Sequence, residues 1–346
     1  MRFTIPSALA AGALLLMHGC AASAPSGAAA EGAAARVVAS SILPAPGAVR
    51  FEPEAGRVPL GHPVPTDSLV VATWNVHVGG GDIRAFVADL RRGALTGGIE
   101  PDAFVVLLQE VHRVARDAEE LPTLRARAGE ESQPLHFAPP SGERTDVVEV
   151  ARELGLHLAY APALPNGRPH RDAPLEDRGV AILSSHALDA VRVVELPRER
   201  QRRVALVGTV QGTTSDGSPW SLQVVSAHLE NRTGWDRLLD SFGAARERQA
   251  RFLARQLGPD PTVLGGDLNT WAPAFMEAAL PVLEAHFPHT PRVEGATFKV
   301  AGIPRRLDHL LFRLPEPGSA RAQVVAERYG SDHHPVMGVV GLRSSR

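Results

Sequence analysis

Short apolar runs separated by polar stretches rich in Pro and Gly dominate the chain from Ser68 onward. Such runs, bounded by turn residues, are typical of buried strands rather than of long helices. The pattern predicts strands at Leu69–Trp74, Ala103–Gln109, Leu158–Ala161, Val180–Leu183, Val204–Val210, Leu222–Ala227, Thr262–Leu264, His309–Phe312, Gln323–Ala326 and Val336–Val340.

A few segments instead repeat apolar residues at spacings of three and four, which is the pattern of a helix with one buried face. These segments are Ile83–Arg92, Val147–Leu154, Leu238–Leu257 and Ala274–Ala285. Many strands with a few long helices predict an α/β fold in which two sheets pack together and helices cover their outer faces.

Polar residues able to do chemistry stand where several of these strands end or begin. They are Asn75, Glu110, His228, Asp267 with Asn269, Asp308, and the segment Ser331–Pro335. Taken singly, each has an ordinary explanation: Asn75 as a turn residue, Glu110 as a partner of Arg113, or His228 as a core imidazole. Because the ends of neighbouring strands meet at one edge of a core, the clusters together predict a single site.

Composition and charge exclude several classes of protein. Hydrophobic residues make up 44% and charged residues 21%, and the mean hydropathy is -0.06, which excludes a wholly disordered chain and a polytopic membrane protein. The 36 basic and 38 acidic residues leave a formal charge of -2, so no overall basic field attracts nucleic acid. The single cysteine, Cys20, rules out an intrachain disulfide and a CxxC-type metal site.

The first 20 residues have the pattern of an export signal. Arg2 precedes the apolar run Ile5–Met17, which is short for a membrane span, and the sequence LLMHGC then resembles a bacterial lipobox ending in Cys20. We predict a lipoprotein signal peptide with lipidation at Cys20, although His18 departs from the usual small residue. The alternative is cleavage near Ala22. Either event places the mature protein outside the cytoplasm, in the cell envelope, the periplasm or the medium, and lipidation anchors it to a membrane.

Residues 21–65 are rich in Ala, Pro, Gly and Ser and show little periodicity, which predicts a tether between the signal peptide and a domain at 66–346. A second interpretation is an N-terminal strand or extension packed on that domain, for which Val49–Val64 is the best candidate.

The polar clusters suit phosphoryl-group hydrolysis, which needs hard oxygen ligands for Mg²⁺ or Mn²⁺, donors for nonbridging phosphate oxygens and a base for water. Read in order, the motifs are TWNV at Thr73–Val76, LLQEV at Leu107–Val111, RGVAILS at Arg178–Ser184, SAHLE at Ser226–Glu230, GGDLN at Gly265–Asn269, RLDHLL at Arg306–Leu311 and SDHHP at Ser331–Pro335. With these motifs the sequence resembles the endonuclease/exonuclease/phosphatase superfamily from about Ser68 to about Gly341. GDLN followed by SDHHP is the most specific part of the resemblance.

The resemblance implies a four-layered α/β/β/α sandwich of two mainly antiparallel sheets flanked by helices. It also implies a divalent cation, Mg²⁺ or Mn²⁺, held by Glu110 with Asn75 and Asp332 close by. His333, oriented by Asp308, would polarise or deprotonate the attacking water.

The remaining implied roles concern the phosphoryl group itself. Asp267 and Asn269 would position the nucleophile and stabilise the pentavalent phosphorus, and His228 would donate to a nonbridging oxygen or assist the leaving group. In deoxyribonuclease-like members a glutamate supports this histidine, but here Arg178 stands at that position. Arg178 either contacts substrate phosphate or pairs with a neighbouring carboxylate, Glu176 or Asp177. We leave His334 out of catalysis.

These observations predict an exported, monomeric, divalent-metal-dependent hydrolase of phosphoric ester bonds, chiefly phosphodiesters. Nucleic acids and phospholipid or inositol-phosphate headgroups both stay open as substrates: the near-neutral charge disfavours the first, and the 5% content of aromatic residues disfavours the second. The alternative function is a catalytically silent envelope lipoprotein that uses the same sandwich for binding. The intact set of motif residues argues against that alternative.

Overall fold

The computed structural model describes residues 49–51, 65–114, 144–166, 176–231, 243–271, 277–300, 302–315 and 318–342. All of them fall in one compact unit, Leu43–Arg346. The predicted signal peptide, Cys20 and most of the predicted tether lie outside the described residues, so the division of the chain at residue 66 stays a prediction. In the part of the chain that is described, no helix is long and apolar enough to cross a membrane.

Two sheets face each other. The first has the strand order β1-β4-β5-β3-β2-β14-β13 and the second β12-β9-β8-β7-β6, while β10 and β11 form a separate hairpin. The first sheet comprises β1 (Val49–Phe51), β2 (Ser68–Asn75), β3 (Phe104–Val114), β4 (His157–Asn166), β5 (Glu176–Ser184), β13 (Ala320–Val324) and β14 (Val336–Gly341). The second comprises β6 (Asp189–Glu195), β7 (Val204–Thr213), β8 (Pro219–His228), β9 (Thr262–Asp267) and β12 (Asp308–Arg313), and the hairpin is β10 (Phe298–Val300) with β11 (Ile303–Arg305).

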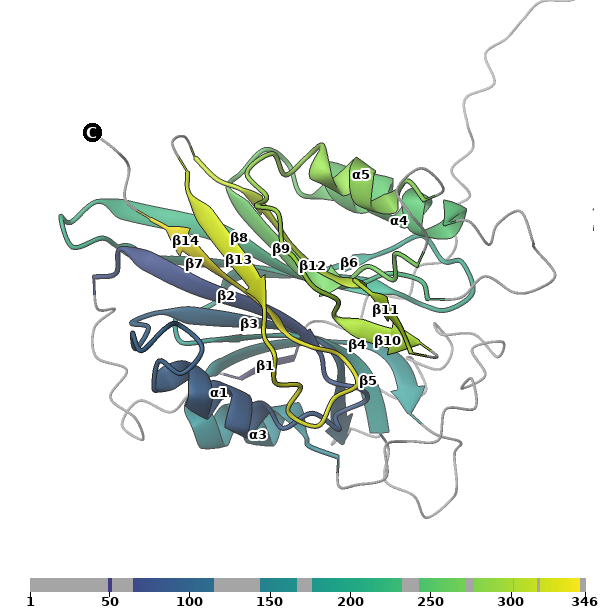
Figure 1. Cartoon of the computed structure of the whole chain (residues 1–346), viewed down its shortest axis with the longest axis horizontal. Coiled ribbons are helices and arrows are strands. Elements are labelled where there is room, and N and C mark those ends of the chain that lie inside the picture. Colours follow the sequence, from purple (N-terminus) through teal and green to yellow (C-terminus); the bar gives the residue numbers. More distant parts are fainter. Residues whose placement is uncertain are drawn as a thin grey trace, which may run out of the picture. The chain divides into compact units, whose positions relative to one another are not determined.

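Alternation along the strands produces three apolar layers. Side chains such as Leu107 and Leu206 point between the sheets and form a shared core. The outer face of the first sheet packs against α1 (Ile83–Arg91) and α3 (Val147–Leu154), and that of the second against α4 (Ala244–Gln256) and α5 (Ala279–Glu284) (Figure 1). The four-layered α/β/β/α sandwich expected from the sequence is confirmed.

The sequence pattern predicted the ends of α3 correctly but not the start of α5. Asp146 caps α3 by accepting the backbone N–H groups of residues 148 and 149, and Gly155 ends the helix with φ 62°. The helix predicted from Ala274 was too long: Glu277 and the next residue are not helical, and α5 begins at Ala279. The carboxylate of Glu277 is instead bound by the buried Arg246 of α4, which directs this segment inward.

All of the predicted strands are present, but the pattern missed four others. β6 is an edge strand in which only one residue is fully buried, and β10 and β11 have three residues each, so none of the three shows a clear apolar run. β1 pairs with β4. The residues of β1 lie inside the segment predicted as a tether. For them the alternative prediction, an N-terminal strand packed on the domain, is confirmed.

The two sheets approach each other closely beside the GGDLN motif. A Cβ atom on Gly265 would lie 2.7 Å from Thr73 Cβ and 2.7 Å from Leu107 Cδ1, both in the opposite sheet. One on Gly266 would lie 2.2 Å from the carbonyl oxygen of Ala227 in the adjacent strand. The two glycines therefore let β9 pack closely against the opposite sheet and against β8, just before its last residue, Asp267.

Candidate active site

Each sheet contains one parallel pair of strands, β2 with β3 and β8 with β9, among otherwise antiparallel neighbours. In register, Asn75 lies beside Gln109 and His228 beside Asp267, so each pair delivers polar residues together at its carboxyl end. The Asn75 side-chain amide donates to Asp267 Oδ2 at 3.0 Å and joins the two sheets. The predicted convergence of strand ends thus arises from this matched topology.

Asp267 is at the centre of the site. Its Oδ1 accepts the backbone N–H of Asn269 at 3.0 Å, and its Oδ2 lies 3.6 Å from His228 Nε2. Asn269 holds its own turn by donating to the Leu229 carbonyl at 3.1 Å. Burial of Asp267, followed by the nearby negative charge of Asp308, raises the pKa of its carboxyl above the usual range.

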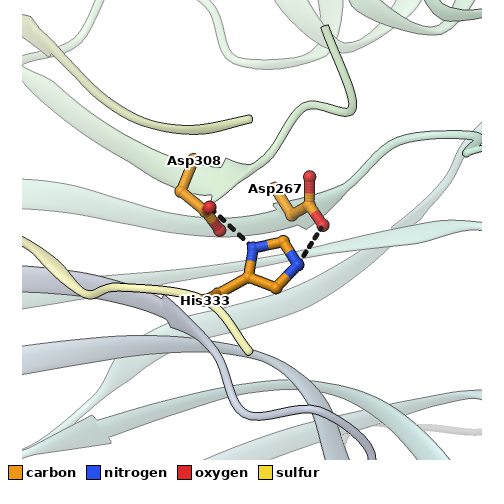
Figure 2. Close-up of side chains that lie close together, drawn as sticks. All are labelled: Asp267, Asp308 and His333. Carbon is orange, nitrogen blue, oxygen red and sulfur yellow. Dashed lines mark hydrogen bonds and ion pairs between the residues drawn. The ribbon is translucent and has the colours of Figure 1, made fainter. Parts of the chain in front are cut away.

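Asp308 and His333 form a buried pair. In β12, Asp308 lies directly opposite Asp267, and its Oδ2 is 2.7 Å from His333 Nδ1 (Figure 2). Burial opposes a charge on His333, but the charge and hydrogen bond of Asp308 outweigh it and raise the pKa of the imidazole to about 10. Backbone contacts fix the ring further, since Trp74 Nε1 donates to the His333 carbonyl at 3.1 Å.

Glu110 sits on a β-bulge. The register of β3 against β5 shifts between Gln109 and Val111, and Glu110 adopts φ 53°, a left-handed conformation that is unusual for a non-glycine residue. Such strain persists where the surrounding structure imposes it, frequently at functional sites. Burial works against ionisation of Glu110, but the positive charges of Arg178 and Arg203 prevail and lower the pKa of its carboxyl.

The carboxylates fit a hard divalent cation. Among the described residues, only through-space charges, those of Arg178, Arg203, His333 and His77, act on the Glu110 carboxylate. Asp332 Oδ1 is buried without a hydrogen-bond partner in the described part of the chain. Oxygen atoms left open in this way are the ligands that Mg²⁺ and Mn²⁺ take, and an imidazole, His77 Nδ1, lies 3.7 Å from Asp332 Oδ1.

A second group of ligand atoms lies next to these. Atoms of Asp267, Asp308 and His333 lie within 4.8 Å of one another, the arrangement of a compact metal cluster. Because His333 Nδ1 is already hydrogen-bonded to Asp308, this group is better described as a hydrogen-bonded relay, with His333 Nε2 4.0 Å from Asp267 Oδ2. The assignment of the cation to Glu110, with Asn75 and Asp332 close by, stays a prediction from the sequence.

Arg178 does not pair with its neighbouring carboxylates. Glu176 accepts from Arg144 at 2.8 Å, and Asp177 is bound by Arg113, so the local pairing considered for Arg178 is wrong, as is the pairing of Glu110 with Arg113. Arg178 instead acts on the charges of the site, where it is among the cations that lower the pKa of Glu110. His228, buried and near Arg203 and Arg178, has a pKa well below its usual value.

Several residues of the site were not singled out from the sequence. Arg203 has an exposed fraction of 5% and lies among the charges around Glu110 and Asp267. His77 follows Asn75 by two residues and donates its backbone N–H to the Asn75 side chain at 3.0 Å. Glu230, the last residue of SAHLE, is fully buried. His334 bonds through Nδ1 to the Val325 carbonyl, away from the relay.

A two-sheet sandwich with a buried Asp–His pair, an amide-bound aspartate and unpaired carboxylates at one edge defines a phosphoester hydrolase. The sequence profile described as the Endonuclease/Exonuclease/phosphatase family matches residues 72–333. The chain therefore belongs to this family, whose members hydrolyse phosphoester bonds and typically depend on a divalent metal.

Two solved structures are similar to this chain. An endonuclease/exonuclease/phosphatase from Beutenbergia cavernae is 24% identical, with a TM-score of 0.53 over 80% of this chain and 72% of the other. A family protein from Leptotrichia buccalis is 15% identical, with a TM-score of 0.49 over 80% of this chain and 100% of the other. No curated protein matches the sequence.

Proposed function

We propose that the chain is an exported, Mg²⁺- or Mn²⁺-dependent hydrolase of phosphodiesters, tethered to a membrane through a lipid on Cys20. The observation that carries the catalytic part is the buried relay of Asp308, His333 and Asp267 near the bulge in β3 that carries Glu110. The export signal and lipobox in the sequence support the location.

In the proposed reaction, a water oxygen attacks phosphorus in line with the leaving oxygen, whose bond to phosphorus then breaks. A divalent cation held by Glu110, with Asn75 and Asp332 close by, would neutralise charge on the phosphoryl oxygens and on the leaving group. Asp308 holds the His333 ring by its Nδ1 so that Nε2 faces Asp267, and the water lies against these two groups. The His333 ring, protonated below its pKa of about 10, orients the water by donating from Nε2, and the Asp267 carboxylate accepts the proton of the water. Asn75 and Asn269 keep the Asp267 carboxylate in place.

A panel of substrates tests this function. The purified full chain is incubated with plasmid DNA, RNA, sphingomyelin and inositol phosphates in Mg²⁺ or in EDTA, with His333→Ala as the inactive control. We expect metal-dependent hydrolysis of a phosphodiester that the control lacks. Nicked plasmid would assign the enzyme to nucleic acids, and release of a headgroup would assign it to lipids. No hydrolysis of any member in Mg²⁺, Mn²⁺ or Ca²⁺ would refute the proposal and favour the silent binding protein.

A further inference from the structure

Two arginines near the relay, Arg203 and Arg178, have hydrogen-bonding capacity that the described residues do not fully use. Arg203 precedes β7 and Arg178 lies in β5, in opposite sheets. In the register of β3 with β5, Arg178 lies opposite His112, next to the bulge that carries Glu110. The positive charges of both arginines act on Glu110 and on His228. Glu110 and Glu230 offset part of the repulsion between the two positive charges, and an anion bound between the arginines would offset more of it.

The Arg203 guanidinium is buried but incompletely satisfied. One terminal nitrogen donates to Gln201 Oε1 at 3.0 Å, whereas Nε has no hydrogen-bond partner among the described residues. The nearest carboxylate oxygen with which it pairs, Glu230 Oε1, is 3.9 Å away. A buried cation with an orphaned N–H is rare in folded proteins, because it is costly unless a ligand completes it.

The segment that carries Arg203 is rigidly held. Glu230, fully buried, accepts the backbone N–H groups of Arg200 at 3.1 Å and Gln201 at 2.8 Å. The next residue, Arg202, is anchored by Glu195 at 3.1 Å and by the Pro162 carbonyl at 2.7 Å. Arg203 is therefore preorganised, so that binding an anion requires little rearrangement.

Arg178 completes the arrangement from the other sheet. Its side chain is half-buried, and it forms no hydrogen bond with any residue that the structure describes. A planar guanidinium presents paired N–H donors that match two oxygens of a phosphate, so an arginine from each sheet can hold different oxygens of one group.

Building on the proposed function, we infer that Arg203 and Arg178 form a clamp for the nonbridging oxygens of the phosphoryl group undergoing transfer. The clamp takes the place of an acidic support for His228, whose nearest carboxylate within the described chain is Asp267 at 3.6 Å. Negative charge that develops on phosphorus-bound oxygen would thus be stabilised by two fixed cations on the side facing His228. The same donors would bind inorganic phosphate without metal.

The test is phosphate binding in EDTA, measured by isothermal titration calorimetry on the purified full chain. We expect saturable binding by the wild-type protein and a loss of affinity of about ten- to a hundredfold in Arg203→Met and in Arg178→Met, because each removes charged hydrogen bonds. Arg203→Lys, which keeps the charge but loses the planar fork, should fall between. Arg251→Met is the matched control, since Arg251 pairs with Glu247 on the exposed face of α4. Circular dichroism and Mg²⁺ titration verify that each variant folds and keeps its cation site.

The outcomes separate this inference from the proposed function. Wild-type protein that binds no phosphate, or methionine variants that bind it as tightly as the wild type, would overturn the clamp even if the enzyme hydrolyses its substrate. If Arg203→Met does not fold, the half-buried Arg178 still decides the matter. In Mg²⁺, the clamp further predicts that both variants lower kcat for bis(p-nitrophenyl) phosphate as well as phosphate affinity. Unchanged kcat would contradict a role in the transition state.

Discussion

Replacing Asp308 by Asn tests whether the buried pair with His333 has the strength that its geometry indicates. The change keeps the shape of the side chain and removes its charge, so the 2.7 Å contact to Nδ1 loses its charge-assisted character. Hydrogen bonds to charged groups contribute about 1.5–3 kcal/mol, and breaking a buried ion pair costs about 3–5 kcal/mol. We therefore expect Asp308→Asn to lower the free energy of unfolding by about 3 kcal/mol at pH 6.

The pH dependence gives this prediction its sign. The pKa of His333 is raised in the folded protein from 6.5 to about 10, so the pair stabilises the fold fully below pH 6.5 and loses that contribution as the pH rises through about 10. The difference between wild type and variant should shrink at pH 9 to roughly a third of its value at pH 6.

Urea unfolding in EDTA measures the effect, at pH 6 and pH 9, for the wild type, Asp308→Asn, His333→Gln and the double variant. The resulting double-mutant cycle isolates the coupling between the two side chains from other consequences of each change. A coupling below about 0.5 kcal/mol at pH 6, as for an exposed ion pair, or one that does not decline at pH 9, would refute a charged, buried Asp–His pair.

Three further predictions address catalysis, packing and location. Asp267→Ala should nearly abolish hydrolysis while the fold is retained. His334→Ala should leave hydrolysis largely intact, because His334 bonds to a carbonyl away from the relay. Equal large losses of activity in the two variants would contradict these assignments. Gly265→Ala should lower the free energy of unfolding by about 1–3 kcal/mol, because the added methyl group would overlap Thr73 and Leu107 in the opposite sheet. An unchanged melting temperature would contradict this prediction and show that the sheets can move apart there. Cys20→Ser should move the protein from the membrane fraction to the soluble fraction, and continued membrane association would count against lipidation.

The sequence predicted the fold well where burial is complete. Strands such as β2 and β9 are buried along nearly their whole length, so their apolar runs were unmistakable. β6 escaped prediction because it lies at a sheet edge and all but one of its residues are exposed or half-exposed. The start of α5 was misplaced for a different reason: Glu277 forms a long-range contact with Arg246, which local periodicity does not record.

The same distinction applies to the site. Asp267 and Asp308 were found because they follow or begin strands within recognisable motifs, and the structure places them opposite each other in β9 and β12. Arg203 was missed because RERQRR reads as a solvated charge run. Its partner Glu230 lies far along the chain, just after β8. The two residues come together only when β7 and β8 pair.

The position of Arg178 gives the departure from the deoxyribonuclease-like pattern a physical meaning. A carboxylate beside His228 would favour an imidazolium there, but Arg178 and Arg203 together oppose that charge, and burial opposes it further. Positive charge on this side of the site is thus carried by guanidinium groups, which stay charged at any physiological pH. A site organised in this way would stabilise the charge of the phosphoryl oxygens without requiring His228 to gain a proton. Substrates whose leaving groups depart readily as anions should therefore suit this chain better than those that need protonation, and comparing aryl phosphodiesters of graded leaving-group acidity would reveal that preference.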